Sequence, residues 1–103
     1  MEFVLVISTA GSKAEADKIA TALLEKRAAA CIQQMPIISQ YRWAGKVQKS
    51  DEILLFIKTR VEYWEQVQKI IKSEHSYEVP EIIRLTIDDG LPEYLDWIKR
   101  ETI

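Results

Sequence analysis

The chain has 103 residues, 48% hydrophobic and 29% charged, which is the size and makeup of one ordinary globular domain spanning residues 1–103. Its formal net charge is -2, with acids and bases interspersed, and this pattern argues against nucleic acid or a membrane surface as partner. The chain has a single cysteine, Cys31, no apolar run near the roughly 20 residues of a membrane span, and no basic leader. Together these features predict a cytoplasmic protein.

The first quarter of the chain predicts a strand followed by a helix. Residues 3–7 are an unbroken apolar run rich in β-branched side chains, which is typical of a central strand covered on both faces. Ser12 is followed three residues later by Glu15, the spacing of a capping box, and apolar residues then recur at helical spacing. We therefore expect a helix from Ser12 to about Arg27.

The middle of the chain predicts a long hairpin. Residues 28–35 are mostly small or apolar, and Pro36 interrupts them before an extended pattern resumes, so we expect a strand that is bent or bulged at Pro36. Gly45 lies between two extended segments, as a tight turn requires. Residues 53–57 form a second apolar run, which indicates that the returning strand is also buried on both faces.

A second helix follows this hairpin. Thr59 and Glu62 have the spacing of another capping box. An apolar stripe then runs through residues 64–71 at helical spacing. The helix is predicted to end near Glu74 or His75.

The last quarter predicts one more strand and a short terminal helix. Beyond Pro80, apolar and polar residues alternate over 83–87, the period of a strand. Pro92 is suited to the first position of the terminal helix. The order β-α-β-β-α-β plus a helix predicts an α+β, ferredoxin-like fold in which two helices cover one face of an antiparallel sheet.

The other face of this sheet needs a cover of its own. Strands that are apolar on both sides, such as 53–57, indicate that this face is buried too, and a partner subunit is the simplest cover. The hairpin is long and aromatic for a segment in water, so we expect it to dock on a neighbour. The predicted interface residues are Tyr41, Trp43 and Gly45.

Residues able to carry chemistry are few. A structural zinc site usually needs four Cys or His ligands, whereas the chain has one of each. In a trimer, three copies of His75 with Glu74 or Glu78 could supply ligands across an interface. The alternative is that His75 is only the polar end of a helix, and Cys31 is expected to pack in the core. No motif combines a nucleophile, a base and oxyanion donors, so no enzyme is predicted.

Five segments carry a family resemblance: 25–31 (EKRAAAC), 41–46 (YRWAGK), 57–59 (IKT), 75–82 (HSYEVPEI) and 94–97 (YLDW). In this order they resemble the CutA divalent-cation-tolerance family over nearly the whole chain. The resemblance implies a homotrimer, similar in architecture to the PII signalling proteins and linked to tolerance of copper, Cu(2+), and other divalent cations. It implies no known reaction.

The resemblance also implies positions for a copper site. Relatives with a proposed site take ligands from a cysteine near the end of the first strand and from two adjacent histidines before the Tyr-Glu-Val-Pro-Glu-like segment. These positions match Ser8, Glu74 and His75 here, of which His75 alone keeps a soft-metal donor. Two alternatives stay open: a PII-like small-ligand sensor with its site near the hairpin, and a scaffold module that binds another protein.

Overall fold

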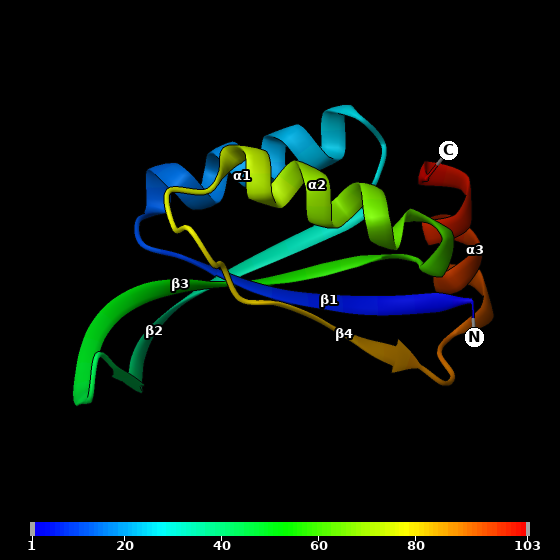
Figure 1. Cartoon of the computed structure of the whole chain (residues 1–103). Coiled ribbons are helices and arrows are strands. Elements are labelled where there is room, and N and C mark those ends of the chain that lie inside the picture. Colours follow the sequence, from blue (N-terminus) through cyan, green and yellow to red (C-terminus); the bar gives the residue numbers. More distant parts are fainter. Residues whose placement is uncertain (1, 103) are drawn as a thin grey trace.

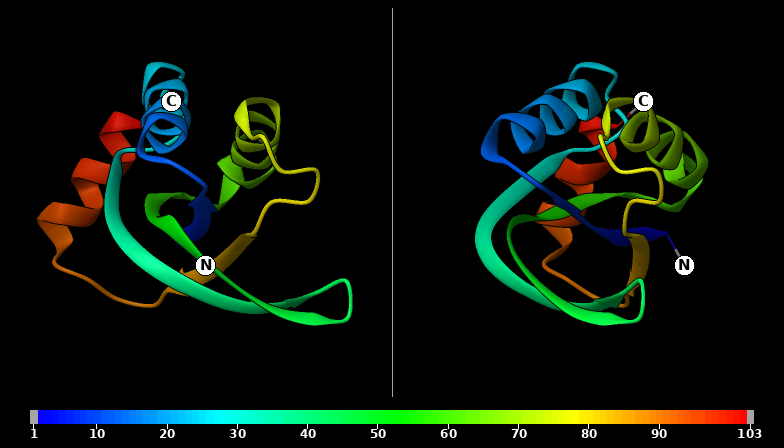
Figure 2. Two further views of the ribbon diagram at one scale, coloured as in Figure 1. Left: turned by 90° about the vertical axis from the view of Figure 1, so that its left-hand side faces the viewer. Right: turned by 60° about the vertical axis from the view of Figure 1, so that its left-hand side comes forward.

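The computed structural model describes residues 2–102. Its elements are β1 (Phe3–Ala10), α1 (Lys13–Glu25), β2 (Cys31–Trp43), β3 (Lys46–Arg60), a 3-10 turn (Val61–Tyr63), α2 (Trp64–Glu74), β4 (Ile82–Ile87) and α3 (Pro92–Glu101). The strands lie in the order β2-β3-β1-β4, and each neighbouring pair is antiparallel. Helices α1 and α2 lie side by side over one face of this sheet (Figures 1 and 2). The predicted ferredoxin-like fold is confirmed.

Helix α1 begins as its sequence predicts. Ser12 is the N-cap, and its hydroxyl accepts a hydrogen bond from the backbone N–H of Glu15 at 3.2 Å. The helix ends at Glu25, close to the expected Arg27, because Arg27 adopts a left-handed backbone with φ of 55°. Helix α2 ends at Glu74 with His75 as its C-cap, also as predicted.

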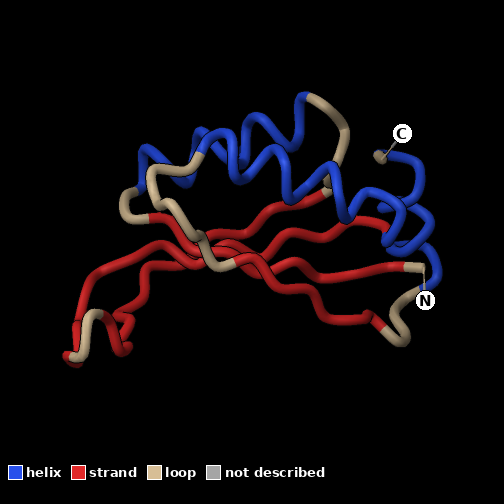
Figure 3. Tube along the Cα trace, viewed as in Figure 1, coloured by secondary structure: helices blue, strands red, loops and turns tan. Residues whose placement is uncertain are grey.

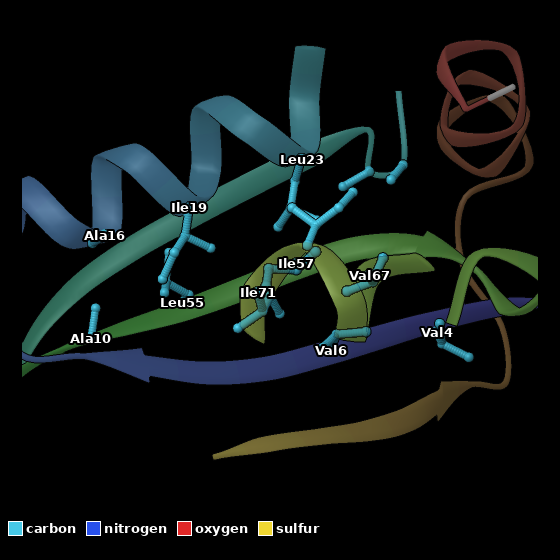
Figure 4. Packing of buried hydrophobic residues seen from close by; sticks show 13 residues of the cluster. Val4, Val6, Ala10, Ala16, Ile19, Leu23, Leu55, Ile57, Val67 and Ile71 are labelled. Carbon is cyan, nitrogen blue, oxygen red and sulfur yellow. The ribbon is translucent and has the colours of Figure 1, made fainter. Parts of the chain in front are cut away.

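The core lies between the sheet and these two helices (Figure 4). Its largest fully buried side chains come from β1, α1, β3 and α2, and include Val6, Leu23, Leu55, Ile57 and Ile71. Burying one such side chain stabilises the fold by about 1.5–3 kcal/mol. The apolar periodicity of the sequence therefore selects both the helices and the face that they cover.

Pro36 does not interrupt the hairpin. Residues 31–43 of β2 each face one residue of β3 in an unbroken register, so the expected bulge is absent. A proline fits here because β2 is an edge strand, where one N–H is not needed for pairing. The hairpin is nevertheless curved: its far end extends beyond the helices and bends away from them (Figure 3).

Two further expectations were wrong. Thr59 caps no helix, because it lies in β3, where its buried hydroxyl donates to the carbonyl of Ala28 at 2.6 Å. The 3-10 turn that precedes α2 has no side-chain cap. Cys31 is partly exposed at the start of β2 and is not a core residue.

The sheet face opposite the helices is open in the single chain. In β3, Leu55 and Ile57 are buried beneath the helices, whereas Leu54 and Phe56, which alternate with them, are only partly buried. Ile83 and Leu85 of β4 are each 50% exposed. Within residues 2–102, no helix is both long and apolar enough to cross a membrane.

Candidate functional site around His75

The chain's one histidine is held where α2 ends beside the end of β1. As the C-cap of α2, His75 leaves the helix with an extended backbone, and its side chain is fully buried. Its Nε2 atom lies 2.6 Å from the carbonyl oxygen of Thr9. A carbonyl can only accept, so Nε2 carries the proton and donates it.

The second ring nitrogen faces two groups. Nδ1 of His75 accepts a hydrogen bond from the backbone N–H of Tyr77 at 3.1 Å, so Nδ1 is the acceptor of the ring and Nε2 the donor. Oε1 of Glu15 lies 3.4 Å from the same nitrogen. Oε2 of Glu15 accepts from the N–H of Ser76 at 3.1 Å, whereas Oε1 is buried and has no hydrogen-bond partner among residues 2–102. One carboxylate oxygen is thus aimed at the imidazole and left unsatisfied.

Two of the three residues matched to a copper site, Ser8 and His75, have separate partners in the single chain. The hydroxyl of Ser8 is buried and donates to the carbonyl of Glu81 at 2.7 Å. Glu15, not Glu74, is the carboxylate paired with His75. No group of three His, Cys, Asp or Glu side chains in the described part of the chain could hold a metal ion. The sequence pointed to His75 but missed Glu15, which lies sixty residues away at the start of α1.

Tyr77 ties this region to the hairpin. Its hydroxyl donates to Oε2 of Glu52 in β3 at 2.8 Å, and its ring lies 4.7 Å from that of His75. Burial, together with the hydrogen bond to Glu52, raises the pKa of Tyr77 to about 12. Gly11 leaves room for this side chain, because a Cβ there would come within 3.1 Å of the tyrosine oxygen.

The predicted interface residues lie at the exposed end of the hairpin. Trp43 is 67% exposed, and the hydroxyl of Tyr41 is 3.3 Å from that of Ser50 across the hairpin. Gly45 has φ of 78° and Ala44 has φ of 52°, so both turn residues are left-handed, as a two-residue hairpin turn demands. The turn leaves the indole of Trp43 in solvent in the single chain.

Fold and hairpin define a class: small α+β proteins with a four-stranded ferredoxin-like sheet, two strands of which continue beyond the sheet as a long hairpin. The family model described as CutA1 divalent ion tolerance protein matches residues 4–101, and the chain belongs to this family.

Two sequence relatives match over most of their length. The divalent-cation tolerance protein CutA of Archaeoglobus fulgidus is 44% identical over 90 residues, which cover 87% of this chain and 88% of the relative. The Thermus thermophilus protein of the same name is 43% identical over 99 residues, covering 95% of this chain and 96% of the relative. The main interpretation of the sequence, a protein of divalent-cation tolerance, is confirmed at this level.

Solved structures match the fold equally well. The A. fulgidus structure, named a periplasmic divalent cation tolerance protein CutA, superposes with a TM-score of 0.95 at 40% identity and covers 96% of this chain and 97% of that one. CutA from Xylella fastidiosa gives a TM-score of 0.97 at 36% identity, with both chains fully covered. The hairpin is therefore part of the shared architecture.

Proposed function

We propose that this chain acts in divalent-cation tolerance as a homotrimer in which each hairpin docks on a neighbouring subunit. The apolar surface left open by the single chain carries this proposal: Trp43 is 67% exposed, Val47 65%, and Ile83 and Leu85 50% each. A small domain buries a limited fraction of its own surface, so covering these side chains with a neighbour is strongly favourable. Tyr41, Trp43 and Gly45 are the proposed contact residues of the hairpin.

The finer part of the proposal is direct binding of copper or another divalent cation at His75. Imidazole nitrogen suits copper and zinc. The 3.4 Å between Nδ1 of His75 and Oε1 of Glu15 is close to the ~3.3 Å expected for two donors held tetrahedrally about 2.0 Å from one ion. Binding requires Nδ1 to release the N–H of Tyr77. The remaining metal ligands would come from water or from a neighbouring subunit. Within the chain, Glu74 is the next carboxylate along the sequence, and the hydroxyl of Ser8 could serve as a ligand once it no longer donates to the carbonyl of Glu81.

One experiment tests assembly and metal binding together. Light scattering of the purified protein gives its oligomeric state, and calorimetric titration with copper and with zinc gives binding, each repeated for His75→Ala and for Glu93→Gln as a control away from the site. A trimer whose copper binding is lost in His75→Ala and kept in Glu93→Gln supports both parts. A trimer that binds neither ion removes the metal part, and a monomer removes the assembly.

The remaining parts of the proposal concern location and catalysis. We place the protein in the cytoplasm, since Cys31 is a free and partly exposed thiol, which suits a reducing compartment. Cell fractionation tests this placement, and recovery from the periplasm would overturn it. We also propose that the protein has no catalytic activity of its own; a turnover abolished by His75→Ala would refute that statement.

A further inference from the structure

The imidazole of His75 is closed off from solvent. Its side chain has no exposed surface, so nothing in solution reaches Nδ1 unless a neighbouring group moves. Tyr77 is such a neighbour: its backbone N–H bonds Nδ1 at 3.1 Å, and its ring centre lies 4.7 Å from that of the imidazole. The acceptor nitrogen of an imidazole has one lone pair, so Nδ1 cannot hold this N–H and a metal ion together. Access to Nδ1 therefore requires the release of Tyr77.

The segment that contains Tyr77 joins α2 to β4 and is anchored at both ends (Figure 1). At its start, the N–H of Ser76 donates to Oε2 of Glu15 at 3.1 Å. At its end, the hydroxyl of Ser8 donates to the carbonyl of Glu81 at 2.7 Å. The residues between these anchors, 77–80, are called the flap below.

Both hydrogen bonds that the flap makes within residues 2–102 come from Tyr77. Its N–H bonds His75, and its hydroxyl bonds Glu52 in β3 at 2.8 Å. Val79, in the middle of the flap, is 81% exposed. Segments with few buried contacts and exposed hydrogen bonds open at a low free energy. The flap is therefore the part of this region that can move while its two anchors stay in place.

Opening the flap leaves two aligned donors behind it. Nε2 of His75 still donates to the carbonyl of Thr9 at 2.6 Å, which keeps the ring in position. Oε1 of Glu15 is buried, has no hydrogen-bond partner among residues 2–102 and lies 3.4 Å from Nδ1. A buried charge is normally paired or bound to a metal. A cation shared by Oε1 and Nδ1 would satisfy this carboxylate and offset the lost bond to Tyr77.

We propose that the flap closes the His75 site in the absence of a divalent cation and opens when Nδ1 and Glu15 bind one. This inference rests on the metal part of the proposed function and adds its regulation. Because Tyr77 also bonds Glu52, opening changes a contact of β3 and so transmits occupancy of the site to the hairpin. All these contacts lie within one chain, and none involves the residues assigned to the subunit contact.

Thermodynamic linkage gives the sign of the first test. If the closed flap excludes the ion, a change that weakens the closed flap strengthens binding. Tyr77→Phe removes the bond to Glu52 and keeps the ring beside His75, so zinc should bind this variant about three- to fivefold more tightly in calorimetric titration. Tyr94→Phe, which removes a hydroxyl bonded to Lys58, should leave the affinity unchanged. Equal or weaker zinc binding by Tyr77→Phe overturns the flap.

Hydrogen exchange of the Tyr77 amide reads the flap directly. It is measured by NMR on the full-length protein, with and without saturating zinc. Ligand binding stabilises the folded state, so core amides such as that of Ile57 should not exchange faster with zinc. The Tyr77 amide should exchange at least about tenfold faster, because opening removes its acceptor. In His75→Ala this amide should exchange fast whether or not zinc is present.

The outcomes separate the flap from the rest of the proposed function. Zinc binding with an unchanged or slower Tyr77 amide overturns the flap and leaves the metal site standing. No zinc binding by either the wild type or Tyr77→Phe removes the metal site, and the flap falls with it. Light scattering of the same samples tests the assembly by itself.

Discussion

Tyr77→Phe removes the hydroxyl that links the segment after α2 to β3. That hydroxyl donates to Glu52 at 2.8 Å, and phenylalanine keeps the ring against His75. A hydrogen bond to a charged group contributes ~1.5–3 kcal/mol. Because Tyr77 is 39% exposed, solvent screens the pair, and we expect the free energy of unfolding to fall by about 1 kcal/mol at pH 8.

The same bond makes a prediction for alkaline pH. The usual pKa of tyrosine is 10.0, and the pKa of Tyr77 is raised to about 12 in the folded protein. Between these values the folded state holds a proton that the unfolded state has lost, so the free energy of unfolding decreases as pH rises. The full shift corresponds to at most ~2.7 kcal/mol, which the exposure of Tyr77 reduces to about 1 kcal/mol.

The assay is urea unfolding followed by tryptophan fluorescence at pH 8 and pH 11, at one protein concentration. The difference in free energy of unfolding between the wild type and Tyr77→Phe should fall from about 1 kcal/mol at pH 8 to about half of that at pH 11. Tyr94→Phe is the control, because the Tyr94 hydroxyl accepts a bond from Lys58 and donates to no carboxylate among residues 2–102. A gap that stays constant between the two pH values would refute the reasoning.

Three further changes test core, cap and assembly. Leu23→Ala removes a fully buried side chain and should lower the free energy of unfolding by about 3 kcal/mol. Leu24→Ala, at a position 44% exposed, should lower it by less than about 1 kcal/mol. Similar losses for the two variants in urea unfolding would contradict the packing described for α1. Ser12→Ala should cost about 1 kcal/mol and Ser12→Asp, which keeps a capping oxygen, much less, as thermal unfolding will show. Trp43→Asp puts a charge in the proposed interface and should shift the trimer toward monomer in sedimentation velocity; an unchanged trimer would place the interface elsewhere.

Local signals in the sequence predicted most of the fold. Apolar runs marked β1 and β3, Ser12 and Pro92 marked the starts of α1 and α3, and Gly45 marked the turn of the hairpin. Each of these signals concerns neighbours in the chain. The element order then left few possible topologies.

Contacts between distant residues could not be predicted in this way. Thr59 has the spacing of a helix cap, but its hydroxyl instead donates to the carbonyl of Ala28, in the segment between α1 and β2. Glu15 has the spacing to reach back to Ser12, yet its carboxylate turns to His75. A capping box and a tertiary contact require the same residue types, so the sequence alone cannot distinguish them.

The proline in β2 has a consequence for strand addition at the edge of the sheet. A free edge of thirteen residues is a template on which strands of other chains could add without limit. Pro36 offers no N–H, so it divides that edge into two shorter stretches, 31–35 and 37–43. Subunits of a closed oligomer can still pair with either stretch. A continuous fibril would lack one backbone N–H donor in every chain that it adds. Pro36 therefore weakens unlimited strand pairing at this exposed edge and favours an oligomer of fixed size.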